Sequence, residues 1–305
     1  MMEQVVNFPV QGEELLGVLH RPEVEPLRQG VLIVVGGPQY RVGSHRQFVL
    51  LARHLEANGV AAMRFDYRGM GDASGDQRDF EDVDEDIKAA IDAFLTECPE
   101  LDRVVIWGLC GAASGGLTYA WRDPRVSGLI LLNPWVRTEE GLAKAYLKHY
   151  YLQRLFSRSL WADLLRGRLN PITSLHSILQ LARRALGRKS AGGGDPGAAT
   201  QDKSQPLPDR MAEGWRRFQG DILVILSGED LTAAEFRDTA AQAPAWDGLL
   251  ADSRVEVKEL RAANHTFSRQ EWRAQVERWT LQWVQRRASG GSSRSAPVSM
   301  EKVIS

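Results

Sequence analysis

Residues 103–116, which read RVVIWGLCGAASGG, are the part of the sequence that most constrains the fold. The apolar run at 104–107 is typical of a buried strand. It is followed by a short glycine-flanked turn with Cys110 at its tip, and then by small residues that can begin a helix. This stretch therefore predicts a strand, a sharp turn and a helix, with a thiol at the turn.

The residues around Cys110 follow the G-x-S-x-G pattern of a nucleophile elbow, with two changes. Cysteine stands at the serine position, and Ala112 replaces the last glycine. Small neighbours are expected because an elbow residue has a strained backbone, and bulky side chains would clash across the turn. The dipole and free N–H groups of a helix N-terminus would also stabilise a thiolate there. Because a free cysteine is more often buried packing, the function of Cys110 depends on the rest of the chain.

Composition limits the classes of function. A chain of 305 residues is long enough for one large α/β domain with an insertion, or for two small domains. The net charge of −1 predicts no nucleic-acid partner. The two cysteines, Cys98 and Cys110, form no CxxC motif, and no cysteine/histidine cluster has the spacing of a zinc site. We therefore expect neither a metal nor a cofactor.

Hydropathy and cysteine content indicate where such a chain would act. No stretch approaches about 18 uninterrupted apolar residues, so we expect no integral membrane segment. The first residues, MMEQVVNFPVQGEE, lack the basic and apolar regions of a signal peptide. Few cysteines favour a reducing compartment. These features predict a cytoplasmic protein.

Strands and helices alternate along most of the chain. A hairpin is expected first, and six further apolar runs follow it, separated mainly by amphipathic helices. Ser44 and Gln47 form a capping-box pattern at the start of the first helix. The alternation predicts an α/β fold whose eight-stranded sheet is mostly parallel and flanked by helices. The expected strands cover residues 4–8, 15–20, 30–35, 60–65, 104–107, 126–132, 221–227 and 255–260.

The alternation stops at about residue 136. Residues 136–212 are predicted to form an inserted helical cap, with a mobile Gly/Pro-rich loop at about 187–210. Residues 289–305 are predicted to be a disordered tail. Residues 137–189 hold 11 Lys and Arg against 3 Asp and Glu. This excess would attract an acyl carrier with phosphate groups, such as coenzyme A, or an anionic membrane surface; a solvated helical face explains it equally well.

Three chemistry-bearing residues follow three of the expected strands. Cys110 follows one strand, Asp230 follows a later one, and His265 follows the last. The carboxyl ends of parallel strands meet at one edge of a sheet, so these side chains are expected to converge there. The order nucleophile, acid, histidine is that of α/β-hydrolases. Glu229 competes with Asp230 for the role of the acid, and Asp230 is favoured.

Four segments, GLCGA, DYRGMGDASG, SGED and ANHTF, resemble those of α/β-hydrolases. The resemblance covers residues 1–135 and 213–288, with 136–212 as the inserted cap. DYRGMGDASG is similar to a loop of monoacylglycerol lipases and acyl-CoA thioesterases, and the cysteine is similar to that of dienelactone hydrolase. GGPQYRVGSHRQFV together with GLCGAAS most resembles the exosortase A system-associated hydrolases of bacteria that make exopolysaccharide. That resemblance implies a cytoplasmic hydrolase linked to exopolysaccharide production and acting on a small-molecule ester or acyl thioester.

The resemblance also implies a role for each candidate residue. Cys110 would attack a carbonyl and form a thioacyl enzyme. His265 would take the thiol proton and later activate water, while Asp230 would orient the imidazolium. The oxyanion hole would use the N–H of Gly111 and a second N–H from the loop after the third strand. Gln39 is favoured for the second donor because Pro38 has no N–H; Gly37 is the alternative.

Other interpretations remain open from the sequence. Ser114 offers a second elbow register, A-x-S-x-G, although it would lie one helical turn past the strand. Arg68, Asp72 and Ser74 are expected to build a hydrogen-bonded structural loop. The same triad would also serve an acyltransferase, and a catalytically silent hydrolase fold that binds a ligand or partner is a further possibility.

Overall fold

The computed structural model describes residues 2–23, 26–36, 39–137 and 204–288. The chain divides into two compact units, Met1–Val136 with Asp209–Ser305, and Arg137–Pro208. Most of the predicted cap and its mobile loop, and all of the predicted tail, lie outside the described residues, so these stay predictions. Helix α7 (Leu207–Arg217) is described, and the last four residues of the loop expected at about 187–210 are therefore helical.

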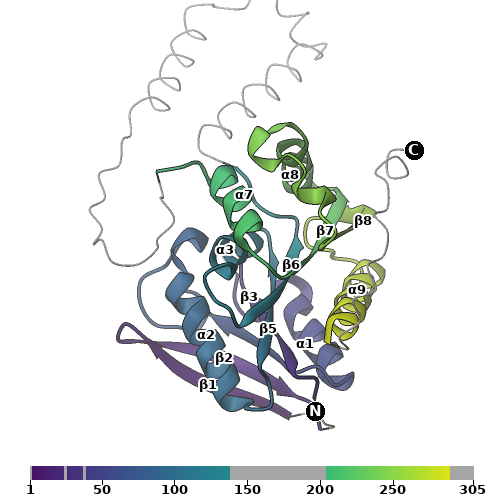
Figure 1. The fold of residues 1–305 in the computed structure, drawn as a ribbon. Helices are drawn as coiled ribbons and strands as arrows, with labels where there is room; N and C mark the ends of the chain where they lie inside the picture. The colour runs from purple at the N-terminus through teal and green to yellow at the C-terminus, as the bar shows by residue number, and fades with distance from the viewer. Residues whose placement is uncertain (1, 24–25, 37–38, 138–203, 289–305) are drawn as a thin grey trace, which may run out of the picture. The chain divides into compact units, whose positions relative to one another are not determined.

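An eight-stranded sheet forms the centre of the first unit (Figure 1). Its spatial order is β1-β2-β4-β3-β5-β6-β7-β8. β1 pairs with β2 and β2 with β4 in antiparallel fashion, and every other pair is parallel. The prediction of a mostly parallel eight-stranded sheet is confirmed. The strands are β1 (Met2–Val10), β2 (Glu13–Arg21), β3 (Gln29–Val34), β4 (Ala62–Asp66), β5 (Arg103–Leu109), β6 (Val126–Leu132), β7 (Asp221–Glu229) and β8 (Val255–Asn264).

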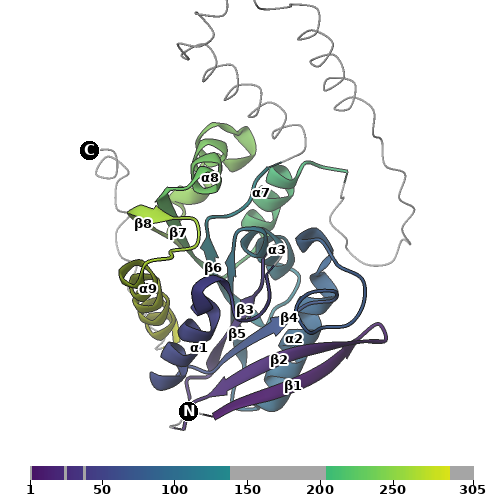
Figure 2. The ribbon, with the colours of Figure 1, turned by 180° about the vertical axis from the view of Figure 1, so that it is seen from behind.

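Helices cover both faces of the sheet. α1 (Gln47–Ala57) and α9 (Gln270–Ala288) lie together on one face, whereas α2 (Asp84–Glu97) and α3 (Gly111–Ala120) lie on the other (Figures 1 and 2). α8 (Leu231–Gln242) follows β7, and four 3-10 turns complete the described elements: Ser44–Arg46, Phe80–Asp82, Pro244–Trp246 and Leu249–Ala251. Every residue of β3 and β4 is buried, as expected for strands covered on both sides.

The predicted capping box at Ser44 is wrong. α1 begins at Gln47, its N-cap residue is Arg46, and no side chain caps it. His45 and Arg46 both adopt left-handed backbone conformations, with φ of 54° and 60°. These two residues turn the chain just before the helix, so the Ser44 hydroxyl does not cap it. The Ser44 N–H is instead 3.4 Å from Oε1 of Gln39.

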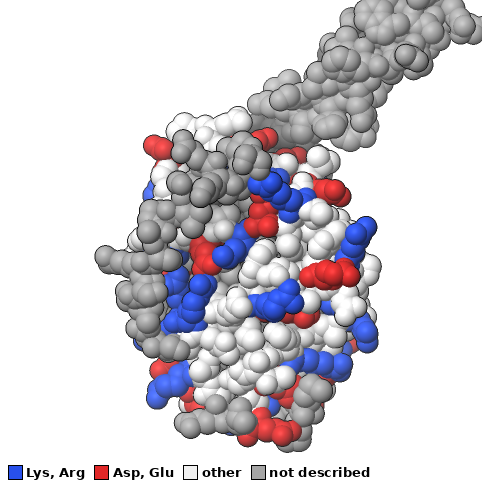
Figure 3. Space-filling model, turned by 90° about the vertical axis from the view of Figure 1, so that its right-hand side faces the viewer, with Lys and Arg blue, Asp and Glu red and all other residues white. Residues whose placement is uncertain are grey.

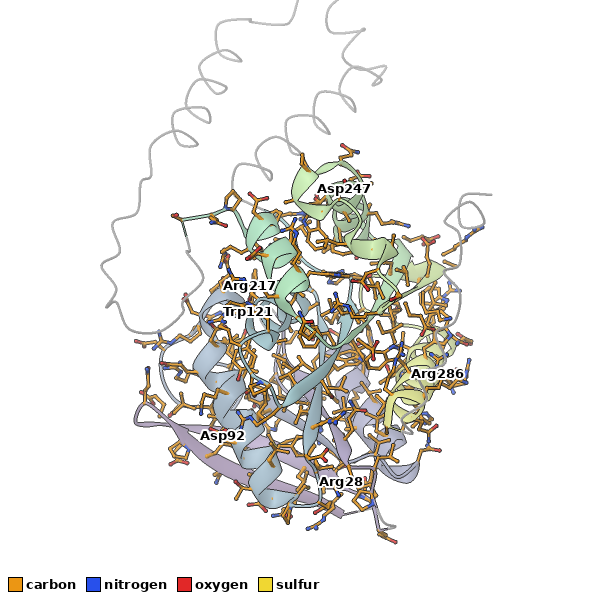
Figure 4. The ribbon with its side chains drawn as sticks, viewed as in Figure 1. Arg28, Asp92, Trp121, Arg217, Asp247 and Arg286 are labelled. Carbon is orange, nitrogen blue, oxygen red and sulfur yellow. The ribbon has the colours of Figure 1, made fainter. Side chains whose placement is uncertain are left out.

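Helix α7 is held against α3 by close backbone packing and by a cation–π contact. A Cβ added to Gly214 would lie 2.7 Å from the carbonyl oxygen of Leu117, so only glycine allows this approach. The Arg217 guanidinium lies 4.5 Å from the centre of the Trp121 ring, and the two side chains are labelled together in Figure 4. α7 therefore packs beside the helix that begins at the elbow.

The loop at 66–75 is a structural element, as the sequence predicted. Arg68 forms a buried ion pair with Asp86, with an Nη2–Oδ2 distance of 2.7 Å. The Ser74 hydroxyl accepts a hydrogen bond from the Glu14 N–H at 2.8 Å. Asp72 pairs with Arg41, at a distance of 2.6 Å. These contacts fasten the loop to α2, to β2 and to Arg41 in the segment between β3 and α1.

Glycine at position 108 is expected to be essential to the strand–turn–helix junction. A Cβ there would lie 2.6 Å from the Ala112 carbonyl carbon and 2.7 Å from its oxygen, and backbone atoms cannot give way cheaply. We expect Gly108→Ala to lower the free energy of unfolding by about 1–3 kcal/mol, measured by urea denaturation. Gly17→Ala in β2 is the control, because its Cβ would make only an ordinary contact of 3.4 Å with the Met63 sulfur. Equal losses in both variants would contradict the prediction.

Candidate active site

Cys110 occupies a strained position between β5 and α3. Its φ and ψ are 60° and −123°, a combination that residues with a side chain rarely adopt. It is the N-cap residue of α3, and its N–H donates to the carbonyl of Leu132 at 2.9 Å. Its side chain is partly exposed, whereas Cys98 is buried. The predicted sharp turn with a thiol at its tip is therefore present.

The loop after β3 lies directly against this turn. A Cβ on Gly36 would come within 2.4 Å of the Leu109 carbonyl oxygen and 2.8 Å of the Ala112 nitrogen. Gly111, the first residue of α3, has its N–H at the helix N-terminus, where intrahelical acceptors are lacking. Gln39 is described and half-buried, whereas Gly37 and Pro38 lie outside the described residues. Gly111 and Gln39 as oxyanion donors remain a prediction.

Asp230 and His265 form a close pair at the carboxyl ends of β7 and β8. The distance from His265 Nδ1 to Asp230 Oδ2 is 2.8 Å. The Asp230 carboxylate also accepts the N–H groups of Thr232 and Ala233, at 3.2 and 3.1 Å, and so caps helix α8. Its rival Glu229 is exposed and is the last residue of β7. The geometry thus favours Asp230 as the partner of the imidazole.

The imidazole of His265 is strongly biased towards its charged form. Its pKa is raised to about 10, first by the hydrogen bond to Asp230 and second by a hydrogen bond with the Cys110 side chain, against the opposing effect of burial. Burial works to raise the pKa of Asp230, but the hydrogen bond and charge of His265, with the two N–H groups of α8, hold it below its usual value. One imidazole therefore interacts with both the carboxylate and the thiol.

Ser114 does not fit a second elbow. It lies inside α3 and is fully buried. Its hydroxyl donates to the carbonyl of Trp135 at 2.6 Å, and no such strained turn precedes it. The Cys110 register places a side chain at the strained turn, and that side chain helps to raise the pKa of His265.

Sequence analysis missed two buried polar residues behind His265. Asn133 follows β6 and Ser227 lies in β7, and neither side chain is exposed to solvent. Asn133 Nδ2 donates to the His265 carbonyl at 3.0 Å and to the Ser227 hydroxyl at 2.9 Å. In the sequence, Asn133-Pro134 served only to end a strand. A polar residue directly after a buried parallel strand was the available signal.

The described part of the chain lacks a metal cluster and a membrane-spanning helix, and the charges on the face in Figure 3 are mixed. No group of three or more His, Cys, Asp or Glu residues there could hold a metal ion. No described helix is long and apolar enough to cross a membrane. On the side shown in Figure 3, Lys and Arg alternate with Asp and Glu instead of forming a single basic patch. Ion pairs such as Arg254–Asp252 and Arg286–Glu256, both 2.8 Å long, are consistent with this mixed surface.

Residues 28–183 match the family described as "Serine aminopeptidase, S33", which is more than half of the chain. The chain belongs to this family. The match ends before Asp230 and His265, and this member carries cysteine at the elbow position.

Among curated proteins, the quorum-quenching protein AidA of Acinetobacter baumannii is 31% identical over 137 residues. The alignment covers 43% of this chain and 43% of AidA, so the chain spans less than half the length of that relative.

Solved structures agree with this chain over nearly its whole length. The Pyrococcus furiosus esterase Pf2001 has a TM-score of 0.61 and 12% identity, over 93% of this chain and 91% of the esterase. DcsB, solved with its substrate analogue, has a TM-score of 0.60 and 14% identity, over 94% of this chain and 100% of DcsB. Est1E of Butyrivibrio proteoclasticus, solved with ferulic acid, has a TM-score of 0.58 and 13% identity, over 93% of this chain and 99% of Est1E. The expected α/β-hydrolase fold is confirmed, and the family is one of hydrolytic enzymes.

The causes of the His265 pKa predict how it responds to substitution. Asp230→Asn removes the largest cause, and Cys110→Ala removes the second. We expect both variants to titrate His265 at a lower pH than the wild type, with the larger decrease in Asp230→Asn. NMR titration of the His265 imidazole measures this directly. His54, whose pKa is lowered by burial, is an internal reference that should not move. A larger decrease in Cys110→Ala would contradict the assigned order of causes.

Proposed function

We propose that this protein hydrolyses a carboxylic ester or acyl thioester of a small molecule through a Cys110–His265–Asp230 triad. The observation that carries the proposal is the imidazole of His265, whose Nδ1 lies 2.8 Å from Asp230 Oδ2 and whose pKa is raised first by Asp230 and second by the Cys110 side chain. A base held between a carboxylate and a nucleophile is the arrangement that acyl transfer requires.

The reaction would proceed in two steps. The Cys110 thiolate attacks the carbonyl carbon, a C–S bond forms, and the carbonyl π electrons move to oxygen. Collapse of this tetrahedral species breaks the bond to the leaving group, which takes a proton from the His265 imidazolium. The neutral imidazole then accepts a proton from water as the water attacks the thioacyl carbon. Collapse of this second tetrahedral species breaks the C–S bond, releases the carboxylic acid and restores the thiolate beside the imidazolium.

The oxyanion of each tetrahedral species is assigned to two backbone N–H groups. Gly111 would supply one from the N-terminus of α3, and Gln39 the other from the loop after β3. The close approach of Gly36 to the elbow supports this choice, because it brings that loop beside the reacting carbonyl. The helix dipole of α3 would add to the stabilisation of negative charge.

The thiol nucleophile favours a good leaving group. A thiolate departs from a tetrahedral species more readily than an alkoxide, because a thiol is much the stronger acid. An ordinary alkyl ester would therefore tend to expel Cys110 and return to substrate. An acyl thioester or an activated ester has a leaving group that competes with the cysteine. We infer that thioesters are the preferred class, including acyl-CoA.

Two finer features of the proposal rest on sequence alone. The basic residues of 137–189 would attract the phosphates of coenzyme A. The resemblance of GGPQYRVGSHRQFV and GLCGAAS to exosortase A system-associated hydrolases supports a cytoplasmic role linked to bacterial exopolysaccharide production. AidA is named a quorum-quenching protein, so signal-molecule esters belong in the same substrate survey.

Mass spectrometry after brief exposure to p-nitrophenyl esters and acyl-CoAs tests the mechanism. We expect one acyl group on Cys110 in the wild type and none in Cys110→Ala, because the thiolate is the only proposed nucleophile. An adduct on Ser114 would contradict the register. Complete absence of an adduct and of turnover would favour a silent binding protein. An adduct released only by added alcohols or amines would favour an acyltransferase.

The acid of the triad is tested by a matched pair of variants. Asp230→Asn should lower kcat/KM by roughly a hundredfold or more, because the imidazolium loses its carboxylate. Glu229→Gln removes an exposed neighbouring carboxylate and should leave kcat/KM unchanged. Hydrolysis rates of a p-nitrophenyl ester measure both. The reverse outcome would assign the acid to Glu229.

A further inference from the structure

The three residues that follow β6 contact both halves of the candidate site. We call residues 133–135 (Asn133, Pro134 and Trp135) the bridge segment. It leaves the carboxyl end of β6, between the elbow after β5 and the loop after β8. The next residue, Val136, is the last before the chain passes into its second unit.

One end of the bridge segment is bonded to the elbow. The Trp135 N–H donates to the Cys110 carbonyl at 3.4 Å. The Trp135 carbonyl in turn accepts the Ser114 hydroxyl at 2.6 Å. The Cys110 carbonyl also accepts the N–H of Ala113 at 3.0 Å, so several donors hold the strained residue in its conformation.

The other end is bonded to the histidine loop. Asn133 Nδ2 donates to the His265 carbonyl at 3.0 Å, and its Oδ1 accepts the Ser227 N–H at 2.8 Å. The Ser227 hydroxyl donates to the Asn264 carbonyl at 2.9 Å, next to His265. Asn133 has a φ of 42°, in the left-handed region that asparagine tolerates better than most residues. A fully buried side chain that uses both its donors and its acceptor is held in one orientation.

We propose that the bridge segment sets the separation of the Cys110 thiol and the His265 imidazole. This inference rests on the proposed function, because the separation matters for catalysis only if the two groups react together. Asn133 and Trp135 act through the backbone of Cys110 and His265, not on reacting atoms, so they are positioning residues. A misplacement of about 1 Å can cost roughly a hundredfold in rate, and the bridge links two loops that are otherwise separate in sequence.

Two variants break the bridge at opposite ends. Asn133→Asp keeps the shape, the tolerated left-handed backbone and the acceptor for the Ser227 N–H, but loses the donation to His265. A carboxylate here would favour the imidazolium but disfavour the thiolate, so Asn133→Gly, which adds no charge and keeps the left-handed backbone accessible, is made as its neutral counterpart. Ser114→Ala removes the hydroxyl that holds the Trp135 carbonyl at 2.6 Å and that also lies 3.4 Å from the Cys110 carbonyl. If Asn133→Asp does not fold, Ser114→Ala still tests the proposal.

Thr118→Val is the matched control. Thr118 lies one turn further along α3, is buried, and donates its hydroxyl to the Gly115 carbonyl at 3.0 Å. The variant removes a buried hydrogen bond from the same helix without touching the bridge segment. The decrease in its thermal stability therefore measures what the loss of a buried hydrogen bond in α3 costs when the bridge segment is intact.

The readout is made on the whole protein without substrate. We measure the ultraviolet absorbance of the thiolate and the rate of iodoacetamide labelling at Cys110 by mass spectrometry, near neutral pH. We expect the labelling rate to fall by roughly tenfold to a hundredfold in both bridge variants, together with the thiolate absorbance. Thr118→Val should keep the wild-type rate. With a p-nitrophenyl ester, the bridge variants should lose kcat with little change in KM.

The outcomes separate the two proposals. Wild-type labelling rates in Asn133→Asp and Ser114→Ala, with lowered thermal stability, would show that the bridge is only structural and would overturn the inference. Labelling of wild-type Cys110 no faster than that of a denatured thiol would overturn it as well. If labelling depends on the bridge but no ester or thioester is hydrolysed, the proposed function fails while the positioning role stands.

Discussion

The strained backbone of Cys110 is the constraint on which the site depends. A residue with φ of 60° and ψ of −123° is held there only if its surroundings compensate for the strain. Its N–H bonds to Leu132 and its carbonyl accepts Ala113 and, at longer range, Trp135. The small residues around it follow from the same geometry, since side chains at Gly36 or Gly108 would collide with the backbone of the turn. The strain thus places the thiol where β3, β5 and β6 end.

The order of the parallel strands explains why distant residues meet at this point. β5, β6, β7 and β8 are consecutive neighbours, and each contributes a polar residue at its carboxyl end. Asp230 has two tasks, since it caps α8 and accepts the imidazole N–H. The hydrogen bonds by which Asp230 caps α8 fix its carboxylate before any substrate arrives, so little reorganisation is needed when the imidazolium forms. Gly228 allows the bulge that brings β7 to this position, because a Cβ there would lie 2.0 Å from the Arg261 carbonyl oxygen.

Sequence patterns predicted the sheet well because each buried strand is a continuous apolar run. The pairing of Asp230 with His265 was also accessible, since both residues follow such runs in a recognisable order. The start of α1 could not be predicted, because the residue types of His45 and Arg46 do not by themselves indicate that both adopt the left-handed backbone conformation. The bridge was missed for a different reason. Asn133 finds its partners 94 and 132 residues away, and no local pattern encodes contacts that exist only after the sheet has formed.

A cysteine at this elbow changes what the neighbouring groups must do. In a serine hydrolase the hydroxyl needs a base at the moment of attack, whereas a thiol can transfer its proton to the imidazole beforehand. The raised pKa of His265, about 10, is consistent with an imidazolium that persists in the resting protein. The later hydrolytic step requires the neutral imidazole, which forms when the leaving group takes the proton. A thiolate or activated phenolate is less basic than an alkoxide and can depart before it is protonated. The imidazolium must then pass its proton to the departed group or to solvent before it can activate water, so the advantage of thioesters and activated esters lies in the first step.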